Sequence, residues 1–254
     1  MAFQVFNPTQ IQNFPWEKRL RKKKAWIYEL PFDEEIEPTD SSKLVWLRTA
    51  YSEYASAAAF TNISQALLAC AAPLDMVSCV NDFAIDELIH TEVAILVANK
   101  LGCNYALEID YNKLVRPASK ENASILKACE LIVRSCCVGE TLTVPILKKS
   151  AELAKSELIS KTLTKIRKDE ISHAQFGWYF LDWAEPFLNQ SDLNFLGNVT
   201  RETIDSFQIV LNAECSESGY GVLACQDFDP IFLSAVQKNV ILPLKERGII
   251  VEID

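Results

Sequence analysis

Two short motifs with the same residue pattern contain the groups most capable of chemistry in this sequence. Residues 86–90 read Asp-Glu-Leu-Ile-His and residues 169–173 read Asp-Glu-Ile-Ser-His. Within each motif the Glu and the His are three positions apart, which on a helix places both side chains on one face. A carboxylate and an imidazole so placed can bind one metal ion. The chain has only two histidines, one in each motif, so a chance pairing is a poor explanation of both.

Two isolated glutamates precede these motifs at comparable distances. Glu53 comes 34 residues before Glu87, and Glu140 comes 30 residues before Glu170. Both lie on the apolar stripe of a predicted helix, and Glu53 is the only acid between positions 40 and 75. A buried carboxylate without a partner is costly, so we expect a cation beside it. Partial exposure at the edge of the stripe is the alternative for Glu53.

Four predicted helices place these groups. The first begins after N-cap residues at positions 39–41 and runs to about residue 70, and the second runs from about 75 to Gly102. An irregular crossover over 103–118 leads to a third helix from Ser119 and a fourth from Ser156 to about 185. Pro145 either bends the third helix near Glu140 or ends it. The chain therefore reads as two copies of one helical hairpin.

We expect an all-α fold made of one domain over residues 1–254. Residues 1–38 contain four prolines and several aromatics and predict an arm with a short helix near 16–26. Residues 39–186 form the four-helix bundle. Residues 187–254 supply two accessory helices, about 192–212 and 230–247, and the last residues form either a strand or a tail.

Charge and hydropathy exclude some classes of partner. The net charge of −9 disfavours nucleic acid. The one basic run, residues 18–24, indicates a solvated arm beside the acidic residues 33–37, with a docking patch as the alternative. No apolar stretch is long enough to span a membrane, and the N-terminus lacks the pattern of a signal peptide. We therefore expect a cytoplasmic protein that binds neither nucleic acid nor membrane.

The eight cysteines contain no C-x-x-C pair. Most fall in apolar helical patterns, so we expect small buried side chains rather than disulfides or zinc ligands. A rubredoxin-like iron site, which needs paired C-x-x-C loops, is also excluded. Any electrons that the protein uses must then come from an external donor.

One Glu from each of two helices and one Glu-x-x-His from each of two others is the ligand set of a di-iron or di-manganese carboxylate bundle. Over residues 39–186 the sequence resembles the ferritin-like superfamily in helix order and ligand types. The resemblance implies two metal ions, with Glu87 and Glu170 bridging or chelating and the other residues more terminal. We expect two iron ions, with manganese or a mixed pair as alternatives. The implied ligands are Glu53, Glu87, His90, Glu140, Glu170 and His173.

The first residue of each motif has an implied role of its own. In family members with this form of the motif, the Asp typically supports the ligands without binding metal. Asp86 and Asp169 would then hydrogen-bond the imidazoles and fix their tautomers. Solvent exposure is the alternative for both.

The superfamily contains iron-storage cages, enzymes that activate O₂ and subunits of larger complexes, and fold alone does not choose among them. The arm and the two accessory helices favour an enzyme: an O₂-activating oxidoreductase, monomeric or homodimeric, that acts on a small organic substrate. A ferroxidase or iron-storage protein and a metal-free structural bundle are the alternatives. We expect Glu53 and Glu140 at the catalytic positions beside the substrate. The expected pocket is apolar, although close helix packing would also explain the small residues; it consists of Ala57, Phe60, Cys137 and Val144.

Overall fold

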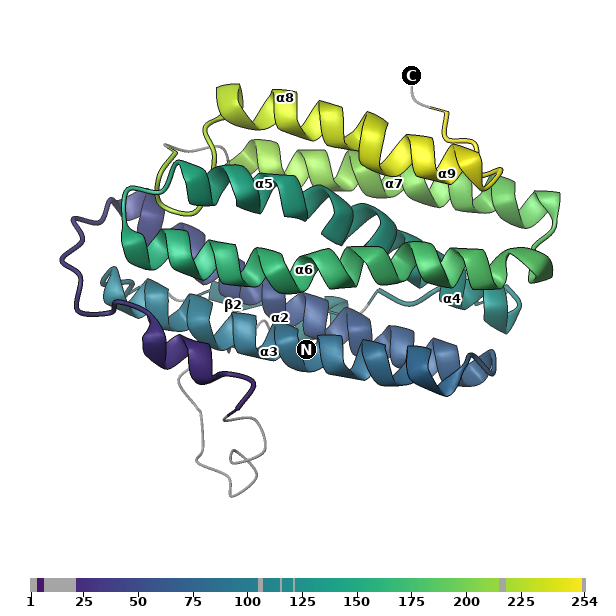
Figure 1. The fold of residues 1–254 in the computed structure, drawn as a ribbon, viewed down its shortest axis with the longest axis horizontal. Helices are drawn as coiled ribbons and strands as arrows, with labels where there is room; N and C mark the ends of the chain where they lie inside the picture. The colour runs from purple at the N-terminus through teal and green to yellow at the C-terminus, as the bar shows by residue number, and fades with distance from the viewer. Residues whose placement is uncertain are drawn as a thin grey trace.

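The structure is a computed structural model that describes residues 4–6, 22–104, 107–114, 116–120, 122–214 and 218–252. The described chain is helical apart from two three-residue strands (Figure 1). The α-helices are α2 (Asp40–Ala69), α3 (Leu74–Lys100), α4 (Ser124–Ile132), α5 (Thr141–Glu152), α6 (Glu157–Ala184), α7 (Gln190–Glu214), α8 (Cys225–Ala235) and α9 (Leu242–Glu246). The π-helices are η3 (Val133–Glu140) and η5 (Val236–Ile241), and the 3₁₀ turns are η1 (Ala25–Glu29), η2 (Tyr111–Lys113) and η4 (Glu185–Phe187). The strands are β1 (Gln4–Phe6) and β2 (Leu107–Ile109).

The helices form a bundle in which two hairpins pack side by side. α2 and α3 make the first hairpin, and the continuous run α4–η3–α5 makes the second with α6. α7 and the run α8–η5–α9 pack against η3 and α5, on the side of the second hairpin away from α2 and α3 (Figure 1). Two predicted hairpins and two additional C-terminal helical segments are therefore present.

Buried apolar side chains form two clusters along the bundle. One cluster lies where α2 begins and includes Trp46 and Leu163. The other includes Phe60 and Phe180 and extends to α7 and α8. Along α2, α3 and α6 the two clusters meet at the level of the Glu and His residues singled out by the sequence, so apolar packing encloses that level at both ends.

Side chains cap the helices at the predicted positions. Thr39 and Ser42 form a reciprocal capping box at the start of α2. Ser156 accepts a hydrogen bond from the Ile159 amide at the start of α6. Gly102 follows α3 with φ of +72°, a conformation that glycine adopts at little cost. These boundaries agree with the predicted ones to within a few residues.

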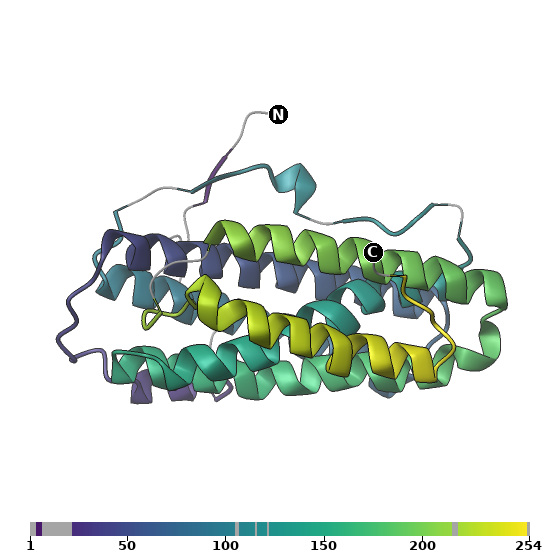
Figure 2. The same cartoon turned by 90° about the horizontal axis from the view of Figure 1, so that it is seen from above.

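The crossover runs along the outside of the bundle at the level of α2 (Figures 1 and 2), where the Asn62 side chain donates a hydrogen bond to the Arg116 carbonyl. It contains β2, which pairs in antiparallel fashion with β1. The third helix begins at Ser124, five residues after the predicted start at Ser119. The Ser119 amide instead donates a hydrogen bond to the Glu130 side chain, which ties the end of the crossover to α4 and delays the helix.

The run α4–η3–α5 is continuous past Pro145, so the helix does not end there. Its irregularity lies one turn earlier, in the π-helix η3, which ends at Glu140. The Thr141 hydroxyl donates a hydrogen bond to the Cys136 carbonyl, five residues back. A π-turn adds a residue to the turn and so changes which side chains face inward after it.

The described part of the N-terminal arm, from residue 22, contacts the bundle, so the end of the basic run is not solvated as predicted. Lys24 is buried and forms an ion pair with Glu92 on α3. Glu34 accepts hydrogen bonds from the Glu157 and Leu158 amides and so caps α6 from outside the helix. Long-range partners of this kind are not encoded in local spacing. The predicted helix near 16–26 lies mostly outside the described residues.

One cysteine at the start of α8 forms a disulfide, contrary to the prediction. Cys225 is disulfide-bonded, and it is exposed at the start of that helix rather than packed on an apolar face. Cys129, Cys136 and Cys137 are buried free thiols, as expected. None of the described helices is long and apolar enough to cross a membrane.

Candidate metal centre

All six sequence-derived candidates converge on one level of the bundle. Glu53 comes from α2, Glu87 and His90 from α3, Glu140 from the end of η3, and Glu170 and His173 from α6. They form two groups of four whose candidate ligand atoms lie within 4.8 Å of one another. One group is Glu53, Glu87, His90 and Glu170, and the other is Glu87, Glu140, Glu170 and His173. Glu87 and Glu170 belong to both groups.

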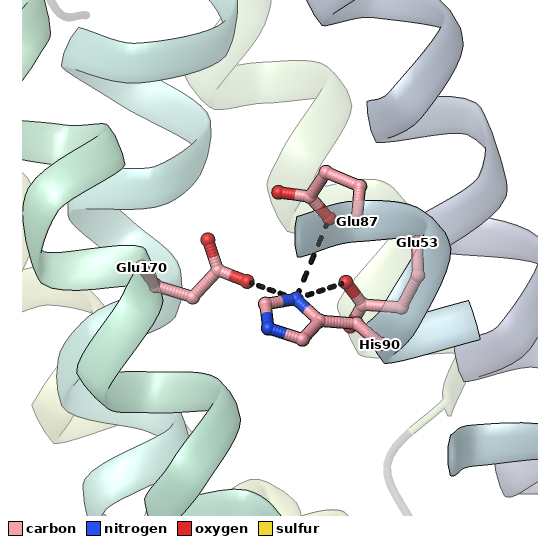
Figure 3. A group of neighbouring side chains, drawn as sticks. All are labelled: Glu53, Glu87, His90 and Glu170. Atoms are coloured by element: carbon pink, nitrogen blue, oxygen red, sulfur yellow. Dashed lines mark ion pairs between the residues drawn. The ribbon is translucent and has the colours of Figure 1, made fainter. Parts of the chain in front are cut away.

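The first group surrounds one ring nitrogen of His90 (Figure 3). His90 Nδ1 lies 3.2 Å from Glu170 Oε1, 3.5 Å from Glu53 Oε2 and 3.7 Å from Glu87 Oε2. The three carboxylates come from three different helices, so the packing of α2, α3 and α6 sets this geometry rather than any local turn.

The second group surrounds Nδ1 of His173. That atom lies 2.7 Å from Glu170 Oε2 and 3.0 Å from Glu87 Oε1. Glu170 therefore directs one oxygen to each histidine, and so does Glu87. Two carboxylates placed symmetrically between two imidazoles are suited to bridging two cations.

The aspartates of the motifs face the opposite ring nitrogens, and they do so across motifs. His90 Nε2 lies 3.2 Å from Asp169 Oδ2, and His173 Nε2 lies 3.6 Å from Asp86 Oδ2. The Asp of each motif thus faces the imidazole of the other motif, which the sequence alone did not indicate. A carboxylate at Nε2 favours the tautomer that leaves Nδ1 free to bind metal.

Burial makes this arrangement costly without a cation. Both histidines are fully buried, and Glu87 and Glu170 are 1% and 2% exposed. Both carboxylate oxygens of Glu87 and Nδ1 of His90 have no hydrogen-bond partner among the described residues. Buried polar groups are normally satisfied, so orphaned oxygen and nitrogen lone pairs at one point fit a bound divalent metal. These side chains could hold a metal ion.

The surroundings raise the pKa of two acids in the cluster, Glu53 and Glu140, and lower that of a third, Glu170. Burial raises the pKa of Glu53 to about 8, against the opposing effect of His90. Burial and the nearby charge of Glu170 raise the pKa of Glu140 well above its ordinary value. Burial alone would also raise the pKa of Glu170, but His173 and His90 outweigh it and hold that pKa well below its usual range.

The neighbouring carboxylates raise the pKa values of both histidines. Burial alone would lower the pKa of His173, but the carboxylates of Asp86 and Glu170 outweigh it and raise the pKa to about 12. Asp169 and Glu170 likewise outweigh burial and raise the pKa of His90. Without metal, protons therefore supply the positive charge that the carboxylates require.

Lys23 is a supporting residue that sequence reasoning missed. Its ammonium group lies 2.9 Å from Asp86 Oδ1 and 2.7 Å from Asp82 Oδ1. The arm thereby holds the carboxylate that faces His173. On the other side, Lys165 lies 3.8 Å from Asp169 Oδ1. The basic run was visible in the sequence, but nothing in its spacing connected it with Asp86, whereas Lys165 precedes Asp169 by one helical turn.

Gly177 lets η3 approach α6 closely enough to present Glu140. A Cβ atom added to Gly177 would lie 2.7 Å from Cys136 Cβ and 2.8 Å from Cys137 Sγ. Atoms at such distances cannot be accommodated without movement. The glycine falls one turn after His173 on the predicted inward face of the helix, which in retrospect was the available signal.

Aromatic rings enclose His173. The Phe83 ring centroid lies 4.4 Å from that of His173, and the Phe60 centroid lies 5.2 Å away. Phe176 packs edge-on against Phe83. The His173 side of the centre is therefore lined with apolar rings.

A partly open cavity of about 130 Å³ adjoins Glu140, between α2, η3, α5 and α7. Of the four predicted pocket residues only Phe60 lines it. Cys137 is directed toward Gly177 on α6, and neither Ala57 nor Val144 is part of the lining. The prediction assumed regular α-helical spacing, whereas η3 rotates Ser135 and Thr143 to the cavity in place of Cys137 and Val144.

No protein-family model matches the chain, and neither a curated protein nor a solved structure is significantly similar to it.

Proposed function

We propose that this protein is a di-iron carboxylate oxidoreductase built on a ferritin-like four-helix bundle, which uses O₂ to oxidise a small organic molecule. The observation that carries the proposal is the sharing of Glu87 and Glu170 between two four-residue groups, each of which has its own histidine. A single-metal site would need only one of these groups. Two groups joined by two carboxylates correspond to a dinuclear centre.

In this proposal Glu53 and His90 would hold one metal and Glu140 and His173 the other, while Glu87 and Glu170 would contribute to both. Four carboxylates balance the charge of two divalent ions, which would offset the cost of burying so many acids. Manganese or a mixed pair would suit the same oxygen and nitrogen donors.

The buried surroundings support oxidation rather than simple metal storage. When bound, the iron pair would supply the electrons that reduce O₂, and an external donor would restore the ferrous state. The chain's own residues would hold the substrate and limit the access of water, through Phe60 and Phe83 beside His173 and through the cavity beside Glu140. Glu140 is the one proposed ligand that also lines this cavity.

The proposal is tested by loading the metal-free protein with ferrous iron under anaerobic conditions and measuring iron content and O₂ consumption. We expect about two iron ions per chain, and O₂ uptake that is much faster than that of a His90→Ala/His173→Ala double variant. Ferrous protein that reacts with O₂ no faster than this variant would contradict oxygen activation. Gel filtration separates the remaining alternative: a cage of many subunits would indicate iron storage, and a monomer or dimer an enzyme.

A further inference from the structure

The cavity beside Glu140 is lined by four hydroxyl side chains. Ser52 and Ser56 come from α2, Ser135 from η3 and Thr143 from α5. Within the described chain none of the four hydroxyls makes a hydrogen bond to another protein group. They are therefore available to a molecule that enters the cavity.

Several hydroxyl groups elsewhere in the bundle behave differently. Those of Thr61, Thr91, Thr162, Thr200 and Thr203 each donate a hydrogen bond to the carbonyl four residues earlier. This is the usual way in which a helical Ser or Thr satisfies its side chain. Some other hydroxyls, such as that of Ser150, also lack a partner, so the distinguishing feature of this wall is that four hydroxyls without such a bond line one cavity.

The volume limits the occupant. The cavity measures about 130 Å³. An apolar cavity of about 150 Å³ in another protein accommodates benzene. Two phenylalanine rings, Phe60 and Phe207, also line the space. A molecule the size of one six-membered ring can contact these rings while its polar group reaches a hydroxyl.

The charge of the lining selects against one class of molecule. Glu140 is the only charged side chain among the residues that line the cavity, and no Lys, Arg or His lines it. No lining side chain offers a positive charge to an anionic ligand, and burying an anion without such a partner is unfavourable. A neutral molecule with a hydroxyl group has no such penalty and can both donate to and accept from the serines.

We propose that this cavity binds a neutral, hydroxyl-bearing organic molecule of about one ring in size. Naming that molecule as the substrate rests on the proposed oxidoreductase function, but its binding does not. The expected pocket was apolar and its substrate a small organic molecule of no stated class, whereas the cavity observed here has a hydroxyl wall and aromatic rings, which favours an alcohol or phenol.

The test uses protein loaded with zinc, which has no redox chemistry, so that binding is measured without turnover. Isothermal titration calorimetry or saturation-transfer NMR would compare benzyl alcohol with toluene, which lacks the hydroxyl, and with benzoate, which carries a negative charge. We expect benzyl alcohol to bind about tenfold more tightly than either. Benzyl alcohol that fails to bind, or benzoate or toluene that binds equally well, would overturn the proposal.

Two substitutions locate the binding. Ser135→Leu and Ser56→Leu fill the cavity from opposite walls, and each should abolish binding of benzyl alcohol while zinc content stays unchanged. Ser78→Leu is the matched control on an exposed face of α3, and it should bind as the wild type does. Undiminished binding in both cavity variants would place the ligand elsewhere. Binding to zinc protein together with no O₂ uptake by the iron protein would reject the oxidoreductase function and leave the cavity assignment in place.

Discussion

The two halves of the bundle present the same ligand types in different surroundings. Around His90, Glu53 projects from a regular α-helix and its side chain is 14% exposed, and the Asp169 carboxylate that faces His90 has Lys165 at 3.8 Å. In the second half, Glu140 ends a π-helix beside a cavity, and His173 is enclosed by aromatic rings. Under the proposed function, the surroundings of His173 would suit a reaction site and those of His90 an anchor.

The comparison shows how a repeated motif can serve two purposes. The repeat supplies the same ligand types to both halves. Structural features outside the repeat make the surroundings of the two histidines different. These features are the π-turn before Glu140, the glycine that admits it and the lysine of the arm that holds Asp86. Each of them gives a way to alter one half and leave the other intact.

The largest expected effect follows from removal of a shared carboxylate. Glu170→Ala should remove both metals, because Glu170 directs an oxygen to each histidine. His90→Ala should remove about one metal per chain, because it belongs to one group only. Elemental analysis after iron loading and desalting distinguishes these outcomes. Equal metal loss in both variants would remove the case for a shared ligand.

The second effect is on the pH dependence of metal binding. The metal-free site keeps protons on both histidines, whose pKa values are raised, and on Glu53 and Glu140. A metal must displace them, so affinity should rise with pH, and two metals should release about four protons near pH 7. Without metal, the stabilisation from the raised histidine pKa values is fully present below about pH 6.5 and is lost only as pH rises through the folded-state values.

Calorimetry with zinc in buffers of different ionisation enthalpy measures the number of protons released. Release of about four protons, together with metal affinity that rises with pH, would support this description of the site. A release near zero would show that the six side chains are already deprotonated and that the carboxylates are neutralised in another way.

A smaller effect is expected when η3 is pushed away from α6. Gly177→Ala places a Cβ against Cys136 and should lower the free energy of unfolding by about 1–3 kcal/mol. It should also weaken the metal bound by Glu140 and His173 more than the metal bound by Glu53 and His90. Chemical denaturation and stepwise zinc titration measure both.

The control for this substitution is Gly139→Ala, in η3 itself. Its added Cβ would meet nothing nearer than the Arg134 carbonyl at 3.3 Å, so the loss should be clearly smaller. Equal losses in the two variants would indicate a general cost of replacing glycine rather than a specific approach of two helices.

The smallest effect concerns the arm. Lys23→Met removes the ammonium beside Asp86 and keeps most of the aliphatic side chain, and it should weaken one of the two metals by about tenfold. Lys165→Met, on the Asp169 side, should change affinity less because its ion pair is longer and partly exposed. Cobalt titration followed by visible absorbance resolves the two steps. Equal effects of the two substitutions would contradict the inequality of the halves.

The sequence predicted the helices and the candidate ligands because both depend on local spacing. The i, i+3 pairing in residues 87–90 and 170–173 required only helical geometry, and caps such as Thr39 and Ser156 marked the helix boundaries. Whether the six residues bind metal in the predicted roles stays a prediction.

What the sequence did not reveal depends on contacts between distant segments. The pairing of Lys23 with Asp86 and the crossed pairing of the aspartates follow from how helices pack, not from their spacing. The π-helix has no local signal here, and most residues that line the cavity beside Glu140 were not among those predicted from the sequence.

The central claim is a pair of metals joined by Glu87 and Glu170. Crystals of iron-loaded protein, with anomalous diffraction measured at the iron edge, test it most directly. The account predicts two anomalous peaks per chain about 3.5–4 Å apart, both within bonding distance of Glu87 and Glu170, one next to His90 and the other next to His173. A single peak, or two peaks that share neither carboxylate, would contradict it.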